Sequence, residues 1–162
     1  MYSTSLLHLL HLCDPSLPVG GFSHSAGLET YVQERIITNK KTAKEFVSQQ
    51  LSQNICYTDA AFVSRAYDAA RSHDFQTILV LDETCTAVKL PKEIRFASNI
   101  LGTRLLKIFE NNKAYVLPNN YKVAISHQQA FGHYCIAWGL LAQALNIDKE
   151  EALTGFYLNG NQ

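Results

Sequence analysis

Residues 14–29, DPSLPVGGFSHSAGLE, contain a pair of adjacent glycines followed by two serines that flank a histidine. The stretch Gly21-Phe-Ser-His-Ser25 shares most of the G-x-S-x-G pattern that exposes a nucleophilic serine in hydrolases. That elbow needs a buried strand before it and a triad base later in the chain, but the preceding residues show a helical pattern that prolines interrupt. A small serine hydrolase acting through Ser23 therefore remains only an alternative hypothesis.

The glycine pair, Gly20 and Gly21, also suggests a phosphate cradle of backbone N–H groups before a helix. A P-loop would add a lysine, and a dinucleotide site would add a preceding strand and a third glycine. None of these accompanies the pair. We therefore favour a structural role for the loop: Pro18 fixes the chain, the glycines allow tight conformations, and Ser23 or Ser25 caps a helix over 26–34.

A second chemical possibility lies in the leucine-rich N-terminal segment. His8 and His11 share a helical face and could hold a soft transition metal together with Cys13. The same repeat is typical of a leucine-rich helix with a polar edge, which is the interpretation we favour. The four cysteines form no CxxC pair and lie far apart, so we expect buried, reduced thiols and neither a zinc knuckle nor a dithiol site. No cofactor is expected.

The elements that position these residues are predicted to be helices. Hydrophobic residues make up 47% of the 162 residues and recur at helical spacing, so the sequence predicts an all-α, multi-helix bundle in one domain, 1–162. Thr42 and Glu45 match a capping box, and Thr58 with Asp59 offers a second cap. Besides the N-terminal segment and 26–34, the predicted helices cover 46–55, 60–71, 75–90, 92–110, 130–146 and 149–158, with a looser stretch over 117–121.

Charge and hydropathy limit the partners. Fourteen basic residues balance fourteen acidic ones, so no overall field favours nucleic acid or an anionic membrane. The longest apolar run, CIAWGLLAQAL, is far shorter than the roughly 20 residues that span a bilayer. The N-terminus lacks the pattern of a secretory signal, which predicts a cytoplasmic protein. A neutral surface also favours self-association.

Three stretches together resemble the urease accessory protein family UreF. The first, LLHLCDPSLPVGGFSHSAGLETYV, carries the family's N-terminal motif, followed by LDETCTAVKLPKEIRFASNILGTRLL and HYCIAWGLLAQALNIDKEEALTGFYL in the expected order. The residues expected to shape this motif or bind partners are Pro18, Gly20, Gly21, Phe22, Ser23, Ser25, Gly27, Glu29, Arg95, Ser98, Gly102, Arg104 and His133. For Arg95 and Arg104, a solvated or ion-paired helix face is favoured over recognition of a partner's anion.

The resemblance implies a function that composition and spacing do not. UreF-like proteins are homodimeric, non-enzymatic maturation factors for the nickel enzyme urease. With UreD, also called UreH, they present a platform for the GTPase UreG on apo-urease, and regulation of the GTPase is also attributed to them. The chain ends at Gln162, where the family continues, so we expect it to lack a C-terminal region that contacts UreD.

Overall fold

The computed structural model describes residues 4–19, 32–49 and 58–159, and within these ranges it contains helices and no strands. The all-α prediction is therefore confirmed. The helices are α1 (Thr4–Leu12), α3 (Lys40–Gln49), α4 (Ala60–Arg71), α5 (Phe75–Val88), α6 (Lys92–Ile108), α7 (Val116–Ser126), α8 (Tyr134–Ala144) and α9 (Lys149–Asn159). In this part of the chain, every helix falls short of the length and apolarity needed to cross a bilayer.

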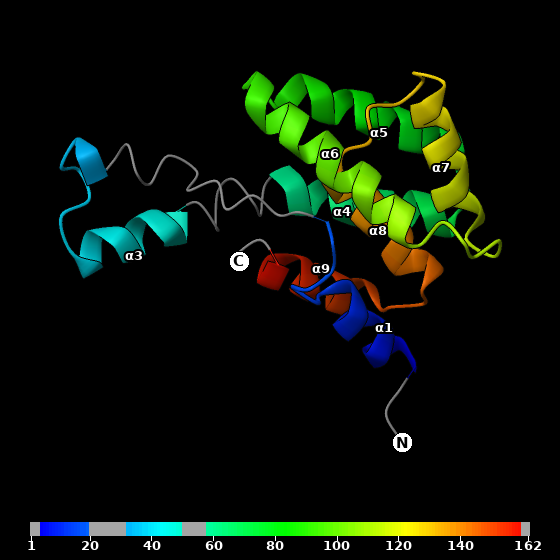
Figure 1. Ribbon diagram of the computed structural model, residues 1–162, viewed down its shortest axis with the longest axis horizontal. Coiled ribbons are helices and arrows are strands. Elements are labelled where there is room, and N and C mark those ends of the chain that lie inside the picture. The colour runs from blue at the N-terminus through cyan, green and yellow to red at the C-terminus, as the bar shows by residue number, and fades with distance from the viewer. Residues whose placement is uncertain (1–3, 20–31, 50–57, 160–162) are drawn as a thin grey trace.

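The core is built around α8. Its residues from Cys135 to Ala142 are all buried, as expected for a helix that other helices cover on every side. Helices α4, α5, α6, α7 and α9 all contact it, and α1 packs against α9 at the lower edge of the bundle in Figure 1. Helix α3 lies to one side of the others.

Polar caps and one tryptophan fix the order of these helices. The Asp74 carboxylate accepts the Thr77 N–H at 3.0 Å, so α5 begins after the link 72–74 that the sequence predicts. Asp148 accepts the Glu150 N–H at 2.9 Å at the start of α9. The indole N–H of Trp138 donates to the Ala152 carbonyl at 3.0 Å and thereby joins α8 to α9.

The predicted cap at Thr42 is wrong, whereas Asp59 does occupy the N-cap position of α4 but without a capping hydrogen bond from its side chain. Asn39 caps α3: its side-chain oxygen accepts the Lys41 and Thr42 N–H groups, while the Thr42 hydroxyl oxygen accepts the Asn39 N–H. Thr42 thus takes the third helical position of a capping box that begins three residues earlier. The Asp59 carboxylate binds Lys89 instead.

Two further helix boundaries differ from the prediction. Residues 117–121, expected to be loose, lie in α7. Pro118 is the third residue of this helix, where a backbone N–H has no intrahelical acceptor, so proline costs no helical hydrogen bond there. Helix α8 begins at Tyr134 and not at residue 130, because Gly132 has a positive φ of 89° and His133 is extended.

Candidate functional site at the junction of α5, α6 and α8

A single buried carboxylate organises the segment that leads into α8. Asp82, on α5, is fully buried, and it accepts the backbone N–H of Phe131 at 2.5 Å and those of Gly132 and His133 at 3.2 Å. The hydroxyl of Tyr121, on α7, donates to the same carboxylate. Burial and the Asp82 charge raise the pKa of Tyr121, so its hydroxyl remains a donor.

His133 links the same segment to α5 and α6. Its ring is fully buried, with Nδ1 at 3.2 Å from the Ser98 hydroxyl and Nε2 at 2.7 Å from the Thr86 hydroxyl. The Ser98 oxygen also accepts the Tyr134 N–H at 3.2 Å. Two residues of the predicted set, Ser98 and His133, are thus in direct contact across 35 positions of sequence.

Gly102 allows α6 to approach this segment. A Cβ atom at residue 102 would lie 2.1 Å from the carbonyl oxygen of Gly132 and 2.8 Å from the backbone of His133. Backbone atoms cannot move aside as the end of a side chain can, so only glycine fits here. Gly102, Ser98 and His133 therefore form one packed junction, which we call the α6–α8 junction.

The two predicted arginines bind backbone carbonyls. Arg95 Nη1 donates to the Lys89 and Leu90 carbonyls at 2.7 and 2.6 Å, and it satisfies acceptors just after α5 ends. Arg104 Nη1 donates to the Val19 carbonyl at 3.3 Å, which connects α6 to the opening loop. Arg104 is exposed, in keeping with a solvated face, and Arg95 is half-buried against the two carbonyls that it binds.

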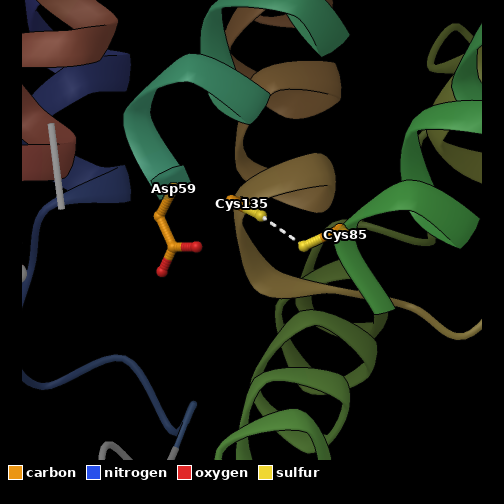
Figure 2. Close-up of side chains that lie close together, drawn as sticks. All are labelled: Asp59, Cys85 and Cys135. Atoms are coloured by element: carbon orange, nitrogen blue, oxygen red, sulfur yellow. Dashed lines mark hydrogen bonds between the residues drawn. The ribbon is translucent and has the colours of Figure 1, made fainter. Parts of the chain in front are cut away.

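Beside the junction, two buried thiols lie next to an ion pair. The sulfurs of Cys85 and Cys135 are 3.6 Å apart (Figure 2). Close by, Lys89 Nζ lies 2.5 Å from a carboxylate oxygen of Asp59. The hydrogen bond from Cys135 lowers the pKa of Cys85 to about 6, whereas burial raises that of Cys135. The prediction of buried free thiols is confirmed for both, although the two sulfurs are in contact while the residues lie 50 positions apart in the sequence.

Most of the opening motif lies outside the described residues. This applies to Gly20, Gly21, Phe22, Ser23, Ser25, Gly27 and Glu29, and so to the serine-hydrolase alternative and to most of the helix predicted over 26–34. Pro18 is described and exposed. The predicted helix over 46–55 is described as far as Gln49, within α3.

The three side chains of the N-terminal metal hypothesis have separate partners. His8 Nδ1 lies 2.9 Å from the Leu145 carbonyl, the His11 ring stacks against Phe109, and Cys13 is half-buried against α9. Among the described residues, the group whose ligand atoms approach one another closely enough to share an ion is Asp59, Cys85 and Cys135.

Sequence reasoning missed three members of the buried network: Thr86, Tyr121 and, above all, Asp82. One signal was available for Asp82, because it interrupts the apolar run ILVL of residues 78–81 in the middle of a predicted helix. A charged residue at a core position is rare unless the fold supplies it with partners. Nothing local in the sequence indicates that those partners are the backbone N–H groups of residues 131–133.

Comparisons with known proteins agree with the motif resemblance. A protein-family model described as UreF matches residues 37–159. The chain is 44% identical over 151 residues to the urease accessory protein UreF of Actinobacillus pleuropneumoniae, covering 93% of this chain and 66% of that protein. It is 43% identical over 156 residues to UreF of Haemophilus influenzae strain PittEE, with coverage of 96% and 66%. UreF of Lachnoclostridium phytofermentans is 35% identical over 158 residues, with coverage of 96% and 68%. The chain thus spans about two thirds of the length of these curated relatives.

Proposed function

Since the chain belongs to the UreF family of urease accessory proteins, we propose that it is a non-enzymatic scaffold in urease maturation. In this proposal it works in the cytoplasm as a homodimer and joins UreD/UreH to recruit the GTPase UreG to apo-urease, where nickel is inserted. Regulation of the GTPase belongs to the same proposal. The observation that carries it is the 43–44% identity to urease accessory proteins over nearly the whole chain.

The described members of the predicted site favour a supporting role. Ser98, Gly102 and His133 are buried, and the described contacts of Arg95 and Arg104 are with main-chain carbonyls of this chain. We propose that they fix the surfaces that partners meet. The residues of the opening motif from Pro18 to Glu29 would form part of those surfaces, and Val19 among them contacts Arg104 of α6.

A second part of the contact surface lies where α5 leads into α6. Three large apolar side chains are exposed there, Leu90 by 80%, Phe96 by 66% and Ile94 by 53%. We call them the α5–α6 corner surface. Large exposed apolar side chains are common in protein-binding surfaces, and such an interface needs no catalytic group.

Urease activation in cells tests this proposal. A strain with urease and the other accessory proteins, but without its own UreF, receives this chain, and urease activity and urease-bound nickel are measured. Tagged chain should also capture UreD/UreH and UreG. The Haemophilus relative serves as the positive control, because it includes the third of its length that this chain does not match. If that relative activates urease while this chain neither activates it nor captures a partner, the proposal is wrong.

The serine-hydrolase alternative is tested in the same strains. If our proposal is correct, Ser23→Ala reduces urease activation only to the extent that it disturbs the loop. The purified protein should also show no esterase activity that depends on Ser23. Turnover of a generic ester that disappears with Ser23→Ala would favour the hydrolase. Ser126→Ala, at an exposed serine in α7, is the matched control.

A further inference from the structure

Three potential ligands from three helices converge beside the α6–α8 junction. Asp59 lies immediately before α4, Cys85 is on α5, and Cys135 is in the first turn of α8. One ligand atom from each, the two sulfurs and a carboxylate oxygen, lie within 4.8 Å of one another. Figure 2 shows the Asp59 side chain beside Cys135, with the two sulfurs facing each other.

We propose that Asp59, Cys85 and Cys135 form a binding site for a thiophilic divalent cation such as zinc. This inference does not depend on the proposed role in urease maturation. Two sulfurs bound to one tetrahedral zinc at about 2.3 Å each lie about 3.8 Å apart. The observed separation of 3.6 Å therefore already suits a shared ion, and both sulfurs can bind with little movement of α5 or α8.

The chemistry of the donors fits such an ion. Each thiol releases its proton to solvent as its sulfur binds, so two thiolates and one carboxylate carry three negative charges. A divalent cation cancels two of them, and the Lys89 ammonium beside Asp59 cancels the third. Soft sulfur donors favour zinc over magnesium or calcium, and a water molecule would complete the tetrahedron.

Lys89 also provides an outer shell for the site. Its Nζ lies 2.5 Å from one oxygen of Asp59, Oδ1. Outer-shell hydrogen bonds of this kind orient a ligand and raise its affinity. The Lys89 side chain is 11% exposed and that of Asp59 29%, so the carboxylate side of the site is open to solvent while the thiols are buried. Asp59 is therefore the ligand on the solvent side of the proposed site.

Spectroscopic titration with Co²⁺ tests the site directly. The full chain, reduced and kept free of oxygen, should bind one equivalent of Co²⁺ with a thiolate-to-metal charge-transfer band and the strong d–d bands of tetrahedral cobalt. Zn²⁺ should then displace the cobalt and raise the melting temperature, and a chelator should reverse that rise. If the folded, fully reduced protein shows no charge-transfer band, the proposal is wrong.

Substitutions identify the ligands. Cys85→Ser and Cys135→Ser should each weaken Zn²⁺ binding by more than the roughly 10–100-fold that loss of an outer-shell partner costs. Asp59→Asn should weaken it while the thiolate band remains. Cys13→Ser, at a half-buried cysteine whose sulfur packs against Gly155 of α9 and is not a member of the three-residue group, is the matched control and should bind normally.

Because a buried serine can unfold the core, binding to wild-type protein is also measured by thiol protection. Zn²⁺ should shield two of the four cysteines from alkylation, and peptide mapping should identify them as Cys85 and Cys135. Protection of Cys13 or Cys56 instead would overturn the proposal.

Discussion

Asp82 shows how one residue can decide the geometry of a site that several motif residues share. Its carboxylate binds three consecutive backbone N–H groups, and these belong to the residues that turn the chain into α8. A buried charge is tolerated only when such donors surround it. The positions of His133 and, through it, of Ser98 therefore depend on a residue that lies in the second resembling stretch but was not singled out as a site residue.

We expect Asp82→Asn to destabilise the protein by about 2–4 kcal/mol, because the neutral amide has a single acceptor oxygen and leaves buried donors without a partner. Urea denaturation at neutral pH measures the loss. Glu83→Gln, at the exposed neighbouring position, is the control and should change stability by less than about 0.5 kcal/mol. Equal stability of Asp82→Asn and wild type would show that the carboxylate does not hold this segment.

Asp74 gives a prediction about pH. Hydrogen bonds from Thr77 lower the pKa of this carboxyl in the folded state, so its stabilising effect is complete above the unfolded value of about 3.9 and disappears as pH falls through the folded value. Asp74→Asn retains a capping oxygen but cannot titrate. As the pH falls, the urea midpoint of the wild type should therefore decrease relative to that of Asp74→Asn. A difference that stays constant from neutral to acid pH would contradict the assignment.

At the scale of elements, the existence of most helices was predictable, but that of α7 and several exact boundaries were not. The periodicity and the polar link 72–74 indicated α4, α5 and α6 correctly, because those signals lie within the helices themselves. The missed helix α7 contains Pro118, which is harmless only because it falls in the first turn. The late start of α8 depends on Asp82, which lies 50 residues away from Gly132. No local pattern carries that information.

Because α6 packs closely against the segment before α8, we expect alanine to destabilise the protein more at Gly102 than at Gly155. Alanine improves helix propensity by about 1 kcal/mol at either position. At Gly102 the new Cβ meets the Gly132 carbonyl at 2.1 Å, and we expect a net loss of about 1–3 kcal/mol. At Gly155, in α9, it meets the ends of the Cys13 and Leu9 side chains at 2.8 Å, which can move, so the loss should be smaller.

Urea denaturation of both glycine variants checks this prediction. Gly155→Ala is the matched control, since it shares the change in propensity and differs in what the methyl group meets. If Gly102→Ala is as stable as Gly155→Ala, then α6 does not approach residues 132–133 as closely as described.

At the scale of the molecule, the sequence identified the family correctly and the site incompletely. Ser98, Gly102 and His133 were singled out by resemblance, and the structure explains their grouping through one junction. The contact between Cys85 and Cys135 could not be predicted, because it depends on how α5 and α8 pack across 50 positions of sequence. Motifs such as CxxC reveal ligands that lie close together in the sequence, whereas Cys85 and Cys135 lie on two different helices.

The α5–α6 corner surface makes the last prediction, which concerns assembly. Because Phe96 is 66% exposed on α6, Phe96→Asp should leave the fold intact, yet a charge in the centre of an apolar interface should weaken partner capture by at least about tenfold. The matched control is Val123→Asp on α7, where a valine is 53% exposed. Circular dichroism verifies folding, and capture by UreD/UreH and UreG, together with urease activation in cells, measures the effect. If both variants bind and activate as wild type does, partners meet another face, and the opening motif, reached through Arg104 and Val19, becomes the surface to test next.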